Sequence, residues 1–568
     1  MNFKEGIANI LAKETKIKKE EAAALITIPP NAKMGDYAFP CFKLGKNAPE
    51  EAEKLKEKIK LSEIKLPEFI FKIEANGPYL NFFIKPSVIA KEILQEIYRQ
   101  QKHYGRQDLG KGKKIIVEFS SPNIAKPFGI GHLRSTVIGN CLYKIYSFLG
   151  YKTIGVNHLG DWGTQFGKLI VAYKKWGEEK ELETGSIKYL LKLYVKFHQE
   201  AEKDDSLNEE ARTAFKKLED GDKEAVALWE IFRELSLEEF KRIYHLLDVE
   251  FDSYHGEAFY NNVLNKTTED LQKKVKTETS EGALVVNLEK YNLPPLILRK
   301  SDGASTYQTR DIAAAFYRLQ KYRPEKIIYV VGSEQKLHFQ QLFKVLELAG
   351  VDKSKLVHVD FGLFHFPEGK MSTRKGNVIF LEEVLDKAIS LAEKIIEEKN
   401  PELGNKKERA KTVGIGAVIF SDLSNDRIRN IDFDWNKMLS FEGETGPYLQ
   451  YTHARACSIL RKAHNEHNLS VSPHVNYETF NLAEEIAVVK QLYAFPEIIV
   501  QTALTYKPHL LAHYLISLAQ SFNEFYHKCP VISGQKQIMK ARLLLVDCVR
   551  QVLENGLNLL GIKAPEEM

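Results

Sequence analysis

The stretch Lys114-Ile-Ile-Val-Glu-Phe119 decides the fold, because a short continuous apolar run is typical of a buried strand in a parallel sheet. A glycine-containing loop, Ser120–Gly131, follows it. Apolar residues then recur at helical spacing over 133–149, and Gly150 ends that helix. A second strand is predicted at Thr153–Val156. The order strand, helix, strand predicts a βαβ unit with a right-handed parallel crossover.

The same alternation returns later in the chain. Strands are predicted at Ile327–Val331 and Leu356–Asp360, with a helix at Phe339–Ala349 between them. We therefore expect an α/β fold with a doubly wound parallel, Rossmann-like core over residues 111–380. A long, charged helical insertion is expected to interrupt this core at about 170–295.

Two further domains are expected to flank the core. Residues 1–110 predict a small α+β domain with strands at Phe69–Glu74 and Tyr79–Ile84. Residues 381–568 have an almost wholly helical pattern. A chain of 568 residues is long enough for about three to five domains.

The composition narrows the class of protein. Hydrophobic residues make up 44% of the chain and charged residues 28%, which excludes a disordered or low-complexity protein. Neither a membrane span nor a signal peptide is recognisable, and the scattered cysteines make a reducing, cytoplasmic location the expected one. The 5 cysteines are scattered and never spaced CxxC, which argues against a disulfide framework and a structural zinc site. A net charge of +5 is too small to indicate a nucleic-acid partner by itself.

The insertion also contains two segments that are rich in charged residues. The segments Glu178–Glu183 and Lys203–Glu210 are strongly charged, and we interpret them as solvated helix faces rather than as a site.

The loop Ser120–Gly131 is the first candidate site, because it lies between a strand and a helix where open α/β sheets bind ligands. Unpaired amides and the positive end of the helix dipole attract phosphate at such a position. His132 stands there and can donate to phosphate oxygens, and Lys126 adds a flexible cation. On these residues alone, an ordinary glycine-rich turn is an equally good interpretation.

The second candidate site is the loop Gly369-Lys-Met-Ser-Thr-Arg-Lys-Gly-Asn377, which holds three cations and two hydroxyls. Such a loop can close over a polyphosphate and neutralise charge as it develops. Lys370 and Ser372 are its candidate functional residues. Taken alone, the loop is also consistent with a solvated basic turn.

Considered together, the two loops carry a family resemblance. PFGIGHLRST (127–136) and KMSTRKG (370–376) resemble the paired signatures of class I aminoacyl-tRNA synthetases. The segments VEFSSPNIAKPF, NHLGDWGTQFG, STYQTRDIAAAFYR, GSEQKLHFQQLF, GETGPYLQYTHAR and LNLLGIKAPEEM resemble those of arginyl-tRNA synthetases in particular. The resemblance covers nearly the whole chain.

The resemblance implies a two-step reaction. ATP and L-arginine would give arginyl-adenylate and pyrophosphate, and the arginyl group would then pass to the terminal ribose of tRNA-Arg. Mg²⁺ would arrive with ATP, adenylate formation would require bound tRNA, and the enzyme would be a monomer. The implied catalytic residues are His132, Gly131, Lys370 and Ser372. The implied ATP-binding residues are Lys126, Gly129, Gly131, His132, His158, Gly332, His338, Lys370, Met371 and Ser372.

Arginine recognition is implied at a second set of residues: Glu118, Asn123, Tyr307, Asp311 and Gln335. Asp311 is expected to bind the guanidinium bidentately, and Glu118 or Asn123 to hold the α-amino group. Lysine would leave polar groups of this pocket unpaired, so no editing domain is expected. Judged by itself, Asp311 is better explained as an acid at a helix N-terminus, and only the whole set of residues favours the arginine pocket. Asp161, in the segment NHLGDW, is readable either as a site residue or as scaffold.

Contacts with RNA are implied for both flanking domains. Phe39 and Asn81 are candidates for contacting the tRNA elbow. Candidates for the helical anticodon-binding domain are Tyr448, Tyr451, Arg455 and Met568. Aromatic side chains can stack on unpaired bases, although each of these is also readable as a core residue.

One residue departs from the family pattern. The first signature usually begins with histidine, and Gly129 stands at that place. Losing a comparable donor typically lowers a rate by ~10²–10³-fold. Gly129 thus keeps one alternative open, an inactive relative that only binds tRNA, and a class I synthetase for another amino acid is a second alternative.

Overall fold

This computed structural model describes residues 3–29, 34–61, 66–183, 187–365, 379–432, 434 and 443–568. The chain forms two compact units. Unit 1 consists of Met1–Tyr104, Arg455–Phe495 and Ser517–Val552. Unit 2 consists of Gly105–Ala454, Pro496–Ile516 and Leu553–Met568.

Unit 1 begins with a small α+β fold, as predicted. Its elements are α1 (Phe3–Glu14), α2 (Lys19–Leu25), β1 (Tyr37–Pro40), α3 (Ala48–Leu61), β2 (Ile70–Asn76), β3 (Tyr79–Ile84) and α4 (Pro86–Gln100). The strands form an antiparallel sheet in the order β1-β3-β2. Strand β1 was not predicted, because it has only four residues and ends in proline.

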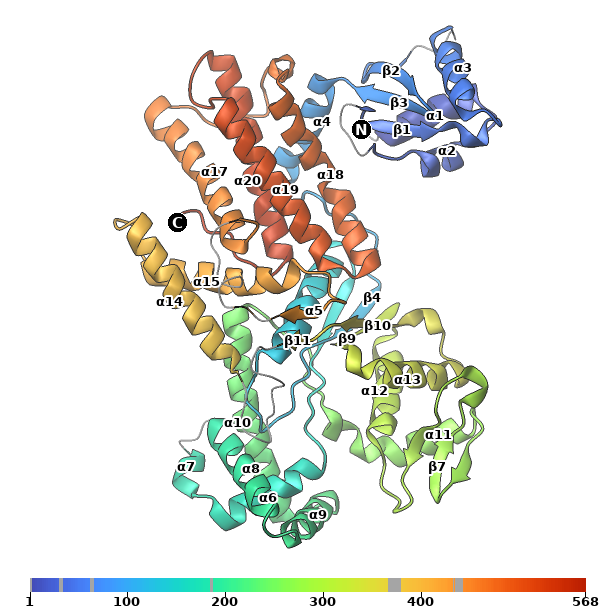
Figure 1. Cartoon of the computed structure of the whole chain (residues 1–568), viewed down its shortest axis with the longest axis vertical. Coiled ribbons are helices and arrows are strands. Elements are labelled where there is room, and N and C mark those ends of the chain that lie inside the picture. Colours follow the sequence, from blue (N-terminus) through green and yellow to red (C-terminus); the bar gives the residue numbers. More distant parts are fainter. Residues whose placement is uncertain are drawn as a thin grey trace. The chain divides into compact units, whose positions relative to one another are not determined.

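The centre of unit 2 is a four-stranded parallel sheet in the order β10-β9-β4-β5 (Figure 1). Its strands are β4 (Lys114–Glu118), β5 (Lys152–Val156), β9 (Lys326–Gly332) and β10 (Leu356–Phe361). The connecting helices include α5 (Gly131–Phe148), α12 (Tyr307–Tyr322) and α13 (Lys336–Leu348). The predicted α/β core is confirmed. The carboxyl ends of β4, β5 and β9 lead into the segments that carry the candidate site.

The insertion is not wholly helical, which corrects the prediction for 170–295. Its helices are α6 (Thr164–Trp176), α7 (Glu179–Glu183), α8 (Ile187–Ala201), α9 (Ser206–Glu219), α10 (Lys223–Leu247) and α11 (Leu264–Gln272). An antiparallel sheet of β6 (Glu278–Ser280), β7 (Ala283–Val286) and β8 (Leu296–Arg299) follows. Val286, Leu296 and Leu298 are buried in one cluster with Ile116 and Ile327 of the parallel sheet. These short strands are therefore part of the core, and their apolar residues are too few for a clear pattern.

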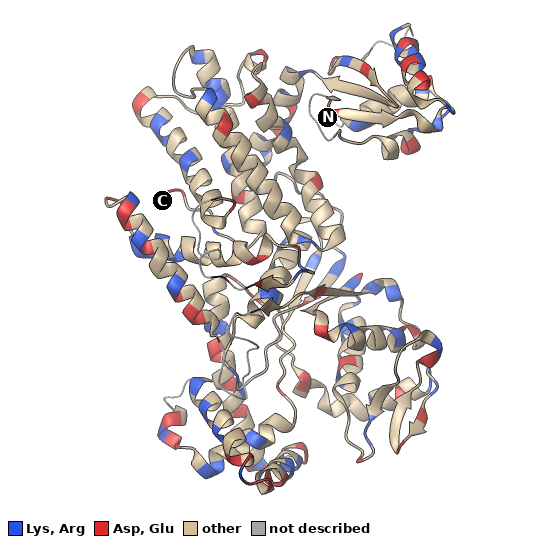
Figure 2. Cartoon of the chain, in the orientation of Figure 1, with Lys and Arg blue, Asp and Glu red and all other residues tan. Residues whose placement is uncertain are grey.

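Both charged runs of the insertion are largely exposed, as predicted. Their surroundings hold exposed ion pairs such as Lys203–Glu200 and Lys175–Glu210. Figure 2 shows both acidic and basic residues on the insertion helices α7 and α9. Exposed pairs of this kind contribute little to stability, so these faces are interpreted as solvated surface.

The rest of the chain is mainly helical. It comprises β11 (Phe364–His365), α14 (Leu381–Lys399), α15 (Lys406–Leu423), β12 (Ile431–Asp432), α17 (Gly446–His467), α18 (Ala483–Thr505), α19 (Pro508–Lys528) and α20 (Lys536–Leu559). Strands β11 and β12 pair in parallel. Within the described ranges, no helix is long and apolar enough to cross a membrane.

Candidate active site

The loop after β4 is conformationally strained. Ser120, Ser121 and Ala125 all have positive φ angles (68°, 48° and 59°), which side-chain-bearing residues rarely adopt. Buried hydrogen bonds hold the loop in this form: the Ser120 amide donates to Ser135 Oγ (2.9 Å), and Thr136 Oγ1 donates to Ser120 Oγ (2.9 Å). Strain that neighbouring groups maintain in this way is typical of functional loops.

The end of this loop forms a ladder with the segment that follows the second candidate loop. The Ile130 amide donates to the Ile379 carbonyl (3.0 Å), and the Leu381 amide donates to the Phe128 carbonyl (2.9 Å). Gly129 and Phe380 are antiparallel partners between these two bonds. Lys370, Met371 and Ser372 lie outside the described residues. The chain on their C-terminal side is thus joined to the residues that precede α5.

His132 is a neutral hydrogen-bond donor at the start of α5. The Gly129 amide donates to its Nδ1 (3.2 Å), so the ring proton resides on Nε2. Burial lowers the pKa of His132 to about 4, and the nearby Lys126 lowers it further. Gly131, the first residue of α5, is exposed. Lys126 Nζ lies 5.6 Å from the Tyr194 ring centroid, over the ring face.

Asp311 lies between two histidines that come from different elements. His338 Nε2 on α13 is 2.7 Å from Asp311 Oδ2, and His158 Nε2 in the loop after β5 is 3.6 Å from Asp311 Oδ1. The Tyr307 ring is 5.1 Å from the His338 ring. The fold thus brings two predicted ATP-binding residues together with two predicted arginine-binding ones. We call the group of Asp311, His158, His338 and Glu257 the acidic notch.

Glu257 belongs to the notch and was missed in the sequence. It is the first residue of a 3₁₀-helix (Glu257–Val263). Burial raises its pKa to about 8, and the charges of Asp311 and Asp161 add to the shift while Arg310 opposes it. Carboxyl groups crowded in this way create a local preference for a cation. The only sequence signal was a single acidic residue in the insertion, outside the two charged runs that we interpreted as solvated helix faces.

Three predicted arginine-binding residues lie in other settings. Glu118 forms an ion pair with Arg318 of α12, and both side chains are buried. Asn123 and Gln335 are exposed. Gly332 ends β9, at the sheet edge where the predicted ligand would lie. The substrate contacts of these residues stay predictions.

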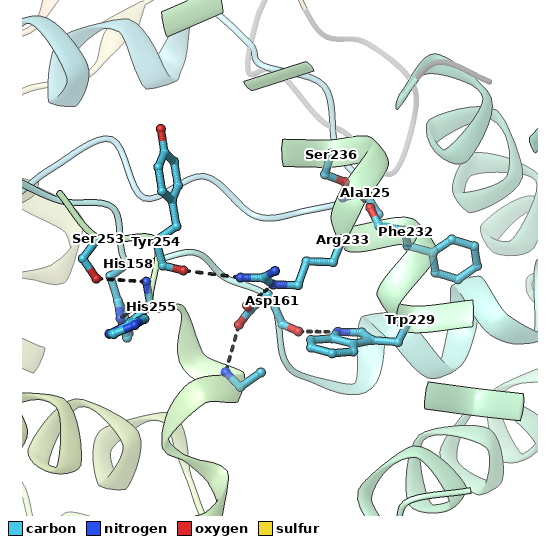
Figure 3. A network of polar contacts seen from close by, with 11 residues as sticks. Ala125, His158, Asp161, Trp229, Phe232, Arg233, Ser236, Ser253, Tyr254 and His255 are labelled. Atoms are coloured by element: carbon cyan, nitrogen blue, oxygen red, sulfur yellow. Dashed lines mark hydrogen bonds and ion pairs between the residues drawn. The ribbon is translucent and has the colours of Figure 1, made fainter. Parts of the chain in front are cut away.

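One face of helix α10 supports the loop that carries His158. Trp229 Nε1 donates to the Asp161 carbonyl (2.7 Å), and Arg233 Nε lies 3.2 Å from Asp161 Oδ2 (Figure 3). Arg233 also donates to the Tyr254 carbonyl (3.4 Å). Asp161 in turn accepts from the Ala258 amide (2.9 Å). Asp161 is therefore scaffold, which decides between the two readings of this residue.

The same helix face supports the loop after β4. Ser236 Oγ accepts from the Ala125 amide (2.8 Å; Figure 3). Tyr244 Oη lies 2.8 Å from Ser120 Oγ and accepts from Asn157 Nδ2 (2.9 Å). The contacting residues of α10 follow one another at steps of four, three and eight positions, which keep them on one face of a helix, and this spacing could have been recognised in the sequence.

The predicted RNA-contacting residues have different exposures. Phe39 and Asn81 are only 0% and 4% exposed, so they belong to the core of unit 1, and the expectation that they contact RNA is corrected. Tyr451 is 48% exposed, and Arg455 lies 5.7 Å from the Tyr526 ring centroid. The remaining two are Tyr448, which is half-buried, and Met568, whose carbonyl accepts from Asn400 Nδ2 (3.2 Å).

Comparison with known proteins covers every part of the chain. Family models match for the class I (R) tRNA synthetase catalytic domain (93–435), the DALR anticodon-binding domain (449–568) and the arginyl-tRNA synthetase N-terminal domain (1–84). Curated arginine–tRNA ligases of Clostridioides difficile and Alkaliphilus metalliredigens are 50% and 47% identical, each over 100% of both chains. The solved Thermus thermophilus arginyl-tRNA synthetase has a TM-score of 0.82 at 27% identity, over 100% of this chain and 99% of that one. The chain belongs to the arginyl-tRNA synthetase family.

Proposed function

We propose that this protein is an ATP-dependent arginine–tRNA ligase. The observation that carries the proposal is the acidic notch, in which Asp311 faces two histidines beside a further carboxyl group. Such a notch suits a planar cation with several donors, which is the chemistry of a guanidinium group. Family membership and the ladder between 128–130 and 379–381 support the nucleotide site next to it.

In the first step, the arginine carboxylate attacks the α-phosphate of ATP, and pyrophosphate leaves. The protein supplies position and charge rather than a nucleophile. We assign the phosphate contacts to His132 Nε2, whose neutral ring donates without adding charge, and to the amides near Gly131. Lys126, Gly129 and Gly332 complete this side of the site. Lys370, Met371 and Ser372 are assigned to the pyrophosphate side.

Mg²⁺ enters the reaction as part of the ATP substrate. Among the residues that the structure describes, no three His, Cys, Asp or Glu side chains are grouped to hold a metal. A metal held by substrate phosphates fits such a site, because Mg²⁺ usually keeps few protein ligands. The lack of structural zinc stays a prediction from the cysteine spacing.

Arginine is assigned to Tyr307, Asp311 and Gln335, with Glu118 and Asn123 towards its α-amino end. Glu118 already forms an ion pair with Arg318. The α-amino group of arginine is therefore bound either by Asn123 or by Glu118 after this carboxylate has left Arg318. His338 donates to Asp311 Oδ2 and so orients the carboxylate. A polar pocket of this type rejects analogues that leave its groups unpaired.

Transfer to tRNA-Arg assigns roles to the other parts of the chain. We propose that domain 1–110 contacts the tRNA and that domain 381–568 binds the anticodon, with the catalytic domain at 111–380. Exposed aromatic residues such as Tyr451, with Tyr448, Arg455 and Met568, are the candidates for RNA contact. The protein is proposed to act as a cytoplasmic monomer.

The decisive experiment is charging of tRNA-Arg with labelled arginine. We expect ATP-dependent charging, weak arginine-dependent pyrophosphate exchange without tRNA, and loss of charging in Asp311→Ala. Charging with a different amino acid would favour another class I specificity. Binding of tRNA without charging would favour the inactive relative.

Gly129→His tests the departure from the family signature. If the usual histidine supplies a transition-state donor, this variant should charge faster than the wild type, by up to ~10²-fold. An unchanged rate would show that the Gly129 amide, which donates to His132, already serves the site.

A further inference from the structure

We propose that His158 is a specificity-determining residue for arginine. Its Nε2 and Asp311 Oδ1 form a pair of acceptors that receives two N–H groups of the substrate guanidinium. This inference rests on the proposed function and deepens it, because the sequence resemblance had assigned His158 to ATP.

The proton position on His158 follows from its anchor. Nδ1 lies 3.1 Å from the main-chain carbonyl of His255. A carbonyl oxygen can only accept, so Nδ1 carries the proton. In the neutral ring, Nε2 is then an acceptor.

That acceptor has no partner of its own. The His158 side chain is 10% exposed, and Nε2 makes no hydrogen bond within the described parts of the chain. It lies 3.6 Å from Asp311 Oδ1, which is longer than a hydrogen bond. A buried acceptor without a partner is costly, so a ligand that donates to it is favoured.

The second acceptor is aimed at the same place. Asp311 Oδ2 receives the His338 Nε2–H at 2.7 Å, which fixes the carboxylate plane and leaves Oδ1 directed towards His158. A guanidinium has five donors in one plane, whose N–H bonds diverge, and can donate to two acceptors a few ångströms apart. A lysine ammonium is a compact point charge and matches this planar pair poorly.

The surrounding scaffold holds the His158 ring in place. The His255 carbonyl belongs to a segment that is fixed on both sides: Arg233 donates to the Tyr254 carbonyl (Figure 3), and the Ala258 amide donates to Asp161. The His255 amide also donates to Ser253 Oγ (3.3 Å). Because its carbonyl anchor cannot shift freely, His158 presents Nε2 in one orientation.

Two substitutions separate the acceptor from the anchor. His158→Asn keeps a donor near the position of Nδ1 and removes the acceptor at Nε2. His158→Gln offers an amide oxygen near the position of Nε2 and loses the Nδ1 anchor. The KM values for arginine and for ATP would be measured in tRNA charging with the full chain, and arginine binding by calorimetry.

We expect His158→Asn to raise the arginine KM and dissociation constant by ~10- to 100-fold, the effect of losing a hydrogen bond to a charged group. The ATP KM should stay within about twofold, and His158→Gln should have a smaller effect on arginine. A rise in the ATP KM alone, or equal effects of both substitutions on arginine, would overturn the proposal. Normal charging by the wild type in that case would leave the proposed function intact.

Discussion

His132 shows how a single residue's surroundings set its chemistry. The Gly129 amide donates a hydrogen bond to its Nδ1, and its pKa is about 4. The ring is therefore a neutral donor at physiological pH, with the proton on Nε2. Because it stands at the helix N-terminus, this donor adds to the amides and the dipole that already favour phosphate. A histidine with an ordinary pKa would instead change its charge near physiological pH.

We expect His132→Ala to lower kcat by ~10²–10³-fold, as removal of one transition-state donor does. His132→Gln should retain part of the rate, because its amide can donate near the position of Nε2. Charging rates at saturating arginine would be measured from pH 6 to 8. With a pKa of about 4, His132 itself should cause no change of rate over this range. A decline below pH 7 that His132→Gln abolishes would contradict this role.

Glu257 predicts a pH dependence of arginine affinity. In the free protein its pKa is about 8, so it is largely protonated at pH 7. A bound guanidinium stabilises the ionised form and lowers this pKa, so arginine binding releases a proton below pH 8. Affinity should therefore rise as pH increases from 6.5 to 8.5, by up to ~10-fold per unit.

Calorimetry in buffers of different ionisation enthalpy would measure the released protons. Asp311, Asp161 and Arg310 also face Glu257, so the matched variant Glu257→Gln is needed to assign the effect. An unchanged pH slope in Glu257→Gln would refute the assignment.

At the scale of elements, helix α10 is a support for two loops of the site. One helix face contacts the segments at 120–125 and 157–161 through Tyr244, Ser236 and Arg233. We therefore expect helix α10 of the insertion to hold the loops of the site, while Glu257 of the same insertion belongs to the acidic notch.

Arg233→Ala should raise the KM values for both substrates by ~10-fold, because it releases Asp161 and the Tyr254 carbonyl together. Arg212→Ala is the control, since Arg212 lies on α9 of the same insertion and its side chain is 67% exposed. Steady-state charging with each substrate varied would measure both effects. A change in only one KM, or an equal change in the control, would speak against a shared support.

The elements that sequence predicts well are those with strong local patterns. β4, α5 and β9 were recognisable because continuous apolar runs and helical spacing are local properties. The sheet β6–β7–β8 was missed because its strands have only three or four residues.

The site divides in the same way. His132 and Asp311 were found because they stand in motifs, whereas Glu257 and Arg233 depend on contacts between distant segments. Phe39 was assigned to RNA, but the pairing of β1 with β3 buries it, which no local pattern reveals.

At the scale of the whole of unit 2, a buried ion pair links α5 to α15. Arg134 Nε lies 3.1 Å from Asp422 Oδ2, and both side chains are at most 1% exposed. Arg134 Nη1 also donates to the carbonyls of Gly362 (2.6 Å) and Arg429 (2.8 Å). One guanidinium thus joins α5 to the segments before β11 and β12.

Arg134→Met should lower the free energy of unfolding by ~3–5 kcal/mol, because it leaves Asp422 buried without a cation. Burial already raises the pKa of Asp422 to about 6, and loss of Arg134 raises it further. The carboxyl can then take up a proton near neutrality, so the destabilisation should be smaller at pH 6 than at pH 8. Urea unfolding of the full chain at both pH values would measure it.

The double variant Arg134→Met with Asp422→Leu is the control. It should recover much of the lost stability, because no lone charge remains. A double variant as unstable as Arg134→Met would mean that the carbonyl contacts of Arg134, rather than its charge, dominate.

The ladder between Phe128–Ile130 and Ile379–Leu381 has a further consequence for how the protein tolerates change. The chain continues from this ladder into α5 and returns to it at residue 379. Main-chain hydrogen bonds therefore hold the two ends of this long segment together. The connection at 203–205 within this segment is exposed. Each doubling of the length of a flexible loop raises the free-energy cost of closing it by only ~0.6 kcal/mol. We therefore expect that extra residues can be inserted there while residues 128–130 stay paired with 379–381.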